Sequence, residues 1–344
     1  MYKGIDGHLS LSIGEGSGTI MWDATQYLRF GGERSRPFFD LLARVGAELP
    51  EHVVDMGCGP GNLTVVLAER WPSAAVCGVD SSRQMIKAAR HLIPADAPQS
   101  TGSGPVLTNH APGLSFMLDD VRHWEPQSLP DVIISNAVLQ WVPGHRELLV
   151  RWAGWLADDG WLAFQVPGNY DQPSHAILRE LVASARWRPL LRDVELNRQS
   201  ADPADYAGLL AGAGCEVDAW ETTYVHILEG EDPVLEWYKG TGLRPVLTVL
   251  DADQAADFLA DYGERVRAAY PPSSFGTVFP FRRVFSVAHQ APLPGFPIDL
   301  IGKLWQDLDM RRDLPLRSAP CRHRVLPGAC PLVLHVQWCP AGSL

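Results

Sequence analysis

A glycine-rich turn over residues 53–62 is the first feature of the sequence with the residue types and spacing to bind a ligand. The segment reads VVDMGCGPGN, in which an apolar run ends in Asp55 and three glycines follow. Glycines at a strand-to-helix turn let the backbone approach a ligand closely and leave amide groups pointing at it. The ligand-binding candidates in this turn, besides Asp55, are Gly57, Cys58, Gly59 and Gly61. The alternative is a tight turn with a purely structural purpose.

The spacing of the glycines separates two classes of ligand. A dinucleotide fold requires Gly-x-Gly-x-x-Gly, whereas here the third glycine comes one residue early and follows Pro60, which disfavours NAD. Asp55 suits a ligand with an amino-acid portion, because a carboxylate anchors an ammonium group directly or through water. S-adenosylmethionine carries such a portion and is therefore the favoured cofactor.

Two further acidic residues follow later strands. Asp80 closes the apolar run in VCGVDSS, where a carboxylate accepts hydrogen bonds from ribose hydroxyls. NAD enzymes use the same contact, so Asp80 alone does not separate the two cofactors. Asp120, in FMLDDVRHW, is placed to accept a hydrogen bond from an adenine amino group; a helix N-cap or a turn is its structural alternative.

Alternating strands and helices form the scaffold that must hold these residues. The apolar strands VIIS and WLAFQV suit a sheet covered on both faces, and strands alternating with helices of about ten residues predict a parallel sheet. The sequence therefore predicts an α/β, doubly wound fold. The strands are expected at 52–56, 75–79, 114–118, 131–135 and 160–166, and the helices at about 62–70, 82–91 and 146–156.

The second half of the sequence changes character. Helices are expected over about 174–185 and 203–213, and long strands over 215–228 and 279–287. Because the helical segment 233–270 lies between those two strands, we expect an inserted helical cap. The predicted organisation is an extension (1–20), a cofactor-binding core with an N-terminal lid (21–168), a cap and substrate region with the last two strands (169–288), and an irregular tail (289–344).

The start and one loop of the core have their own patterns. An amphipathic helix is expected from Glu33, with apolar residues at helical spacing. A loop between His91 and Leu114 is rich in proline, glycine and serine and is expected at the surface.

Composition and net charge argue against some classes of binding partner. The 344 residues are 46% hydrophobic with a net charge of -11, which opposes a broad nucleic-acid or membrane surface. No apolar run reaches the roughly 20 residues of a spanning helix, and a signal-peptide pattern is missing. We expect a soluble, cytoplasmic monomer or homodimer. The six cysteines are scattered and expected as free thiols, and the Cys and His residues of the tail lack the spacing of a metal site.

Several separated motifs together resemble class I S-adenosylmethionine-dependent methyltransferases: DMGCGPG, the Asp80 and Asp120 turns, and SNAVLQWV. Within that group residues 21–288 resemble the trans-aconitate 2-methyltransferases, through MWDATQYLRFGGERSRPFFDLLARV, VVDMGCGPGNLT, SNAVLQWVPGH, VPGNYDQPSHAILREL, VLEWYKGTGLRP and FPFRRVFSVA. The extension, the 91–114 loop and the tail depart from that pattern.

This resemblance implies a seven-stranded Rossmann-like sheet and a set of site residues. It implies that Tyr27 and Gln26 are catalytic residues of a lid over the methyl donor, and that Ser81, Val121 and Asn136 join the cofactor site. It also implies catalytic positions beside the transferred methyl group for Asn136, Gln140 and Trp141. Trp141 and Trp237 are expected to exclude water.

The implied reaction is carboxyl O-methylation of a small polycarboxylate, with the monomethyl ester of trans-aconitate as product. Arginines grip carboxylates with two parallel hydrogen bonds, so they are the leading substrate ligands. The substrate-binding candidates are Arg34, Tyr224, His226, Arg244, Arg282 and Arg283, with Arg29 and Arg36 as further arginines. The alternatives are methylation of another acid, small or acyl, and a regulatory protein that binds S-adenosylmethionine without turnover.

Overall fold

A mixed sheet forms the centre of the protein in the computed structural model, which describes residues 31–93, 113–196 and 200–290. Its main strands run in the order β3-β2-β1-β4-β5-β8-β6, and a short strand, β7, pairs with β8. β1 to β5 are parallel, whereas β8 is antiparallel to both β5 and β6. The bounds are β1 His52–Met56, β2 Ala75–Asp80, β3 Gly113–Leu118, β4 Val132–Asn136, β5 Trp161–Pro167, β6 Glu216–Leu228, β7 Pro272–Ser273 and β8 Gly276–His289.

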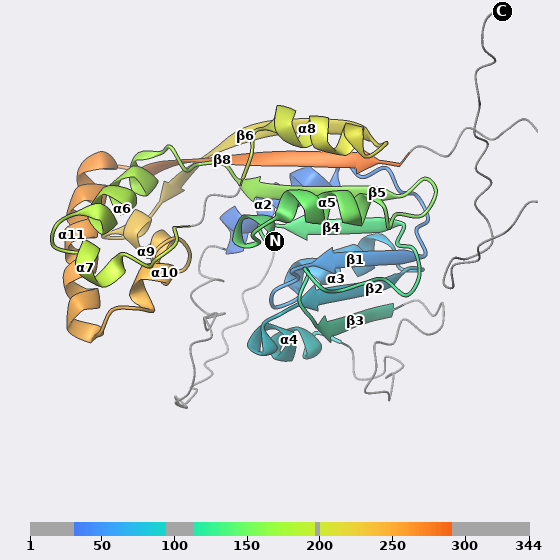
Figure 1. Ribbon diagram of the computed structural model, residues 1–344, viewed down its shortest axis with the longest axis horizontal. Helices are drawn as coiled ribbons and strands as arrows, with labels where there is room; N and C mark the ends of the chain where they lie inside the picture. Colours follow the sequence, from blue (N-terminus) through green and yellow to red (C-terminus); the bar gives the residue numbers. More distant parts are fainter. Residues whose placement is uncertain (1–30, 94–112, 197–199, 291–344) are drawn as a thin grey trace, which may run out of the picture. The chain divides into compact units, whose positions relative to one another are not determined.

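Helices cover both faces of this sheet, as the apolar strands predict (Figure 1). One face packs against α2 and α3 through Phe38, Leu41 and Leu67, all fully buried. The other packs against α5 and α8 through Trp152 and Tyr206. The helices are α2 Gly31–Leu42, α3 Asn62–Arg70, α4 Arg83–Arg90, α5 His145–Ala153, α6 Pro173–Ala183, α7 Arg188–Leu191, α8 Pro203–Gly212, α9 Pro233–Lys239, α10 Arg244–Leu247 and α11 Ala252–Ala269.

The α/β class, the doubly wound sheet and the inserted helices are confirmed, with small corrections to the elements. The expected segment 233–270 is three helices, α9 to α11, and β8 begins three residues before position 279 and extends to His289. Three short elements were not expected: α7, β7 and the 3-10 helix η1, Leu139–Trp141. Short elements escape prediction because they contain too few residues to show a period.

The inserted helices form a cap with an apolar core of its own. Helices α6, α7, α9, α10 and α11 gather beyond one end of the sheet, where β6 and β8 reach furthest (Figure 1). Their core includes Trp237, Tyr238, Phe258 and Tyr262, each at most 2% exposed, packed with Phe279 of β8. The long strands β6 and β8 therefore belong both to the sheet and to the cap.

Local sequence signals explain several helix starts. Proline occupies the first turn of α6, α8 and α9, where its missing amide costs no hydrogen bond. Asp251 caps α11 by accepting a hydrogen bond from the Gln254 amide at 2.9 Å. Within the described residues Cys58, Cys77 and Cys215 are buried free thiols, as expected. No helix in that part of the protein combines the length and apolarity needed to cross a membrane.

Candidate active site

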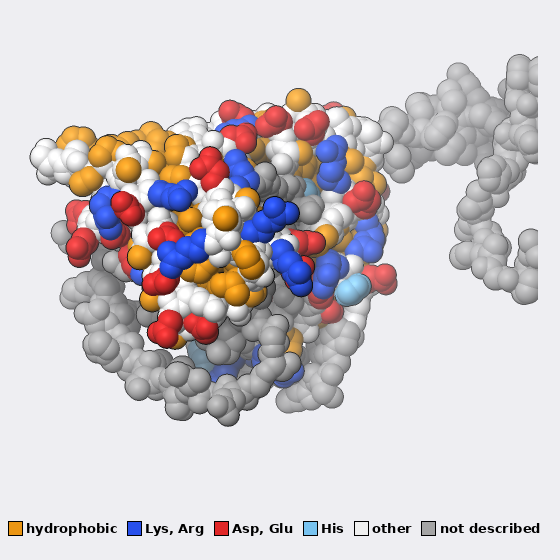
Figure 2. Space-filling view, turned by 60° about the vertical axis from the view of Figure 1, so that its left-hand side comes forward, with side chains coloured by type: hydrophobic (Ala, Val, Ile, Leu, Met, Phe, Trp, Pro, Cys, Tyr) orange, Lys and Arg blue, Asp and Glu red, His pale blue; other side chains and the backbone are white. Residues whose placement is uncertain are grey.

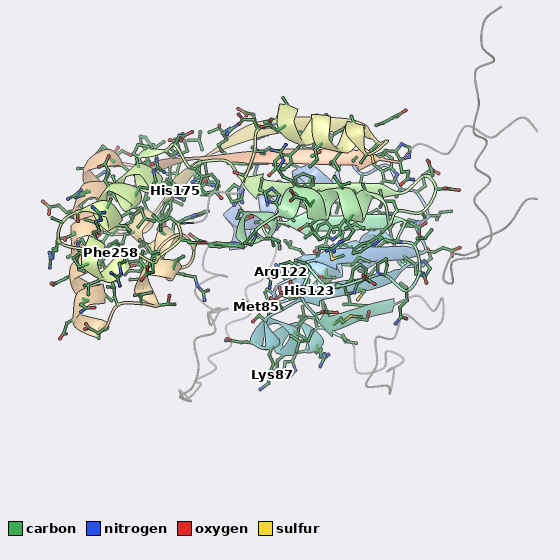
Figure 3. The ribbon with its side chains drawn as sticks, viewed as in Figure 1. Met85, Lys87, Arg122, His123, His175 and Phe258 are labelled. Carbon is green, nitrogen blue, oxygen red and sulfur yellow. The ribbon has the colours of Figure 1, made fainter. Side chains whose placement is uncertain are left out.

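A cavity of about 380 Å³ lies between the cap and the carboxyl ends of the parallel strands. The strand order reverses between β1 and β4 at this edge, which is where open α/β sheets bind ligands. Figure 3 shows Met85 of α4 and Arg122 on the sheet side, and His175 of α6 on the cap side. All three line the cavity, so sheet and cap share one chamber.

The glycine turn after β1 forms part of the wall, and its first two glycines meet different surroundings. Gly57, Gly59 and Gly61 all have left-handed backbone angles, with φ of 80°, 56° and 83°. A Cβ on Gly57 would lie 2.2 Å from Cγ2 of Val138, whereas nothing lies within 4 Å of a Cβ on Gly59. Gly57 thus permits close packing of the turn against Val138, which also lines the cavity, and Gly59 leaves open space. Gly57, Gly59 and Pro60 line the cavity.

Asp80, at the end of β2, organises the same turn. Its carboxylate accepts hydrogen bonds from the backbone amides of Gly59 at 2.9 Å and Ser82 at 2.8 Å. Burial raises the pKa of Asp80, and these two hydrogen bonds act against that rise. Asp80 and the neighbouring Ser81 both line the cavity, in the positions that the sequence predicts for contacts to the cofactor.

Asp55 is placed differently from the other predicted cofactor residues. It is 2% exposed, accepts a hydrogen bond from Oγ1 of Thr64 at 2.6 Å and lies behind the turn, not on the cavity wall. Burial raises its pKa to about 7. Cys58 and Gly61 also lie off the wall, and burial raises the pKa of the Cys58 thiol. A direct contact from Asp55 to an ammonium group is therefore not favoured by this geometry.

The turn after β3 brings Asp120 and Val121 to the cavity, together with an arginine that the sequence analysis missed. The guanidinium of Arg122 pairs with the Asp120 carboxylate at 2.6 Å and lowers the pKa of Asp120. This ion pair occupies the carboxylate that was expected to contact adenine. Arg122 follows Asp120 by two residues, and its position after a strand end was the available signal.

The end of β4 and the segment after it hold the predicted catalytic residues Asn136, Gln140 and Trp141, all of which line the cavity. Ala137 between them has a left-handed backbone with φ of 57°, a strained conformation for a residue with a Cβ. The Ala137 carbonyl accepts a hydrogen bond from Nε2 of Gln140 at 2.6 Å. Since that bond fixes the amide, Oε1 of Gln140 is left as a buried acceptor with no partner among the described residues.

The two arginines of FPFRR lie on opposite faces of β8, because side chains alternate along a strand. Arg283 is 6% exposed and lines the cavity, with its guanidinium 4.5 Å from the Phe281 ring centre. Arg282 points away and binds Asp202, Glu221 and the carbonyl of Gly168. Arg282 thus finds its anionic partners within the protein, and its predicted substrate contact is not supported.

Most of the other substrate candidates lie outside the chamber. Tyr224 and His226 share a face of β6, as the spacing predicts, with ring centres 6.3 Å apart. Tyr224 donates a hydrogen bond to Asp40 of α2 at 2.6 Å and lies near Arg36, whereas the ring centre of His226 lies 5.3 Å from that of the wall residue Trp237. Arg244 lies in α10 beside the wall residue Pro245. Gln26, Tyr27, Arg29 and the Arg34 side chain lie outside the described residues.

The cap contributes a polar cluster that the sequence analysis did not find. Tyr238, 1% exposed, accepts a hydrogen bond from Nδ2 of Asn169 at 3.0 Å and bonds Oγ of Ser174 at 2.7 Å. Oδ1 of Asn169 has no partner among the described residues, although it is buried. Asn169, Tyr170, His175 and Trp237 line the cavity beside Tyr238. The position of Asn169 directly after β5 was the signal for it, since strand ends meet at this edge.

The matching domain family and the curated relatives agree that the chain is related to methyltransferases. Residues 30–219 match the methyltransferase domain family. The trans-aconitate 2-methyltransferase of Streptomyces avermitilis is 52% identical over 274 residues, 78% of this chain and 97% of that protein. The trans-aconitate 2-methyltransferase of Rhodococcus jostii is 51% identical over 271 residues, 78% of this chain and 99% of that protein. Among solved structures, the YcgJ protein of Bacillus subtilis is similar with a TM-score of 0.46 and 12% identity, over 74% of this chain and 98% of that chain.

Proposed function

Because the chain belongs to the family of trans-aconitate 2-methyltransferases, we propose that it transfers the methyl group of S-adenosylmethionine to a carboxylate of trans-aconitate, forming the monomethyl ester. The observation that carries this proposal is that one cavity joins the Gly57–Pro60 turn to the buried Arg283. A cofactor-binding edge and a cation for an anionic substrate thus meet in one chamber.

The residues of the chamber fit S-adenosylmethionine. The space beside Gly59 is open to a ligand, and Asp80 is the strand-end carboxylate for the ribose. The unpartnered Oε1 of Gln140 suits a positively charged ligand. When bound, the cofactor supplies an electrophilic methyl group on a sulfonium.

The substrate needs no general base. A carboxylic acid with an ordinary pKa of about 4 is already ionised at neutral pH. The protein must therefore align one carboxylate oxygen with the methyl carbon and exclude water, an effect that supplies on the order of 7 to 11 kcal/mol. Trp141 and Trp237 provide aromatic wall on the sheet and cap sides.

Recognition of the remaining carboxylates falls to donors within the cavity. Arg283 is a buried guanidinium on the wall, and a buried cation is stabilised when an anion binds beside it. An anionic substrate of small size suits this wall better than a long apolar acid. The partner proposed for this protein is accordingly a small polycarboxylate.

A two-step experiment tests the function. Calorimetric titration with S-adenosylmethionine is expected to show one site, and methylation is then measured with trans-aconitate, cis-aconitate, citrate and isocitrate. The highest kcat/KM is expected for trans-aconitate. Cofactor binding without transfer to any acid would support a regulatory protein, and faster transfer to an acyl acid would reassign the substrate.

A further inference from the structure

A buried series of hydrogen bonds connects Arg283 to Asn136 through Gln165 of β5. Nη1 of Arg283 donates to Oε1 of Gln165 at 3.3 Å, and Nε2 of Gln165 donates to Oδ1 of Asn136 at 2.6 Å. Strand register creates this arrangement, because Gln165 pairs with Asn136 in β4 and with Phe285 in β8. Gln165 is 1% exposed and does not line the cavity, whereas both of its partners do.

The chemistry of the groups fixes the direction of each hydrogen bond. A guanidinium has donors only, so Gln165 must turn its carbonyl toward Arg283 and its amide nitrogen toward Asn136. Oδ1 of Asn136 is therefore occupied as an acceptor. Nδ2 of Asn136 has no hydrogen-bond partner among the described residues, and it remains as the donor for a ligand in the cavity.

We propose that Gln165 is a positioning residue that holds Arg283 and Asn136 as two donors for the carboxylates of the substrate. The inference rests on the proposed function, since it takes the ligand to be a polycarboxylate. Without Gln165, the Asn136 amide is free to turn over and present Oδ1 to the anion, which replaces an attractive contact by a repulsive one. Such support for a ligand-contacting residue typically changes affinity by 10- to 100-fold at metal sites.

Gln165→Leu tests this role, because leucine fills a similar volume without polar atoms. The probe is trans-aconitate, titrated calorimetrically into enzyme saturated with S-adenosylhomocysteine. We expect the Kd of trans-aconitate to rise at least tenfold, with a parallel rise in KM, a smaller change in kcat and a Kd for S-adenosylhomocysteine within twofold of wild type. Unchanged binding of the acid would overturn the proposal.

Ser286→Ala is the matched control. Ser286 is fully buried in β8 and pairs with Phe164, the residue before Gln165, and its hydroxyl has no partner among the described residues. Its removal perturbs the same part of the sheet without touching the hydrogen bonds to Gln165. We expect the Kd of trans-aconitate to stay within twofold of wild type. A rise equal to that of Gln165→Leu would assign the effect to sheet packing and overturn the proposal.

A double-mutant cycle with Asn136→Ala tests whether Gln165 acts through Asn136. Once Asn136 is truncated, adding Gln165→Leu is expected to weaken acid binding much less than it does in wild type. Effects that multiply fully would overturn the role of Gln165 in holding Asn136 and would leave Arg283 as the residue through which it acts. Should Gln165→Leu fail to fold, Gln165→Glu replaces it, because an ionised carboxylate still accepts from Arg283 and cannot donate to Asn136. The same rise in Kd is expected, and unchanged binding would again overturn the proposal.

The titrations separate this inference from the proposed function. A wild-type protein that binds neither S-adenosylhomocysteine nor trans-aconitate would contradict the function itself. A wild-type protein that binds both, together with a Gln165→Leu variant that binds the acid equally well, would contradict only the role of Gln165.

Discussion

At the scale of single residues, the arginines in and near the chamber differ in burial and in the groups that hold them. Arg283 is buried on the wall, whereas Arg122 is paired with Asp120 and Arg282 is held by Asp202 and Glu221. Arg283 combines a buried guanidinium with a position on the cavity wall, so it is the arginine whose removal we expect to affect the anion most.

Substitution of the two neighbouring arginines separates these roles. Arg283→Ala is expected to weaken trans-aconitate binding by about 2 to 5 kcal/mol, the usual range for truncating one partner of a buried charged pair. Arg282→Ala is expected to leave that binding unchanged and to lower stability slightly, since its partners are partly exposed. Calorimetric titration of both variants with the acid measures the difference, and equal effects would place the anion elsewhere.

The sequence predicts the residues of this site unevenly. Gly57, Gly59, Asp80, Asn136 and Gln140 follow strands whose ends meet by topology, so a local motif suffices to place them at the cavity. Arg282 and Arg283 were not separable, because a shift of one residue in strand phase exchanges the faces. Motifs also do not reveal Gln165, whose importance arises only from the register of β4, β5 and β8.

At the scale of elements, the turn between β1 and α3 couples folding to ligand binding. Gly57 faces the side chain of Val138, and Gly59 faces open space. The two positions look alike in the sequence and in their φ angles, but they meet different surroundings. The structure therefore predicts different consequences for the same substitution.

Gly57→Ala is expected to destabilise the protein, because its Cβ would overlap Val138 and its φ is 80°. The expected loss is about 1 to 3 kcal/mol from overpacking, with a further about 1 to 2 kcal/mol from the left-handed backbone. Gly59→Ala carries only the backbone cost, but its methyl group would fill space on the cavity side. We expect Gly59→Ala to fold and to bind S-adenosylmethionine at least tenfold more weakly.

Thermal unfolding and calorimetric titration measure these two effects. A Gly59→Ala protein with wild-type affinity for S-adenosylmethionine would show that the cofactor does not approach this part of the turn. A Gly57→Ala protein as stable as wild type would show that Val138 moves aside easily.

Prediction of the elements themselves depended on their length. The strands of the core and the helices α3, α6 and α8 lie within two residues of the predicted bounds. The cap is harder to predict, because α9, α10 and α11 are defined by packing among Trp237, Tyr238 and Phe258 rather than by a repeated local pattern. A local pattern also does not fix which residues are buried: Phe39 follows the apolar pattern of α2 but is 48% exposed.

At the scale of the whole molecule, charges of both signs are mixed on the surface. Figure 2 shows one face of the protein, on which acidic and basic side chains are interspersed. With a net charge of -11 for the whole chain, long-range attraction of a polyanion is not expected. Binding of the acid then depends on groups inside the cavity, and its affinity should respond weakly to salt.

Global stability is expected to depend on pH through Asp55. Its pKa in the folded protein is about 7, against 3.8 for an unperturbed aspartate. Between those values the folded state retains a proton that the unfolded state releases, so the free energy of unfolding falls as pH rises from about 4 to about 7 and levels off above. Asn in place of Asp55 keeps an acceptor for Thr64 and removes this titration.

Urea unfolding of wild type and Asp55→Asn at several pH values between 5 and 8 checks this expectation. The stability of the variant relative to wild type is expected to increase up to about pH 7 and then stay constant. Parallel curves would show that Asp55 is not protonated in the folded protein at pH 5 to 7.

Truncation tests how far the folded unit extends along the chain. His289 is the last residue of β8; it stacks on Trp161 with ring centres 4.3 Å apart and bonds Asp159 at 2.7 Å, and the Gln290 amide bonds the carbonyl of Gly160. A chain ending at residue 290 is expected to keep kcat/KM within twofold of the full chain. A chain ending at Ala288 loses these contacts, and we expect a lower melting temperature by differential scanning calorimetry. Loss of activity on removing residues 291–344 would assign them a role in catalysis.

The pairing of Leu228 with Thr277 means that β6 and β8 enter and leave the cap side by side. The cap segment between them is thus an elaborated hairpin loop, and the entropy of closing such a loop grows only slowly with its length. Different segments can be exchanged at this point while the seven main strands stay in register. Part of the chamber wall can therefore change by replacement of the one contiguous stretch that carries α9 to α11, whereas α6 and α7 precede β6 and would stay unchanged.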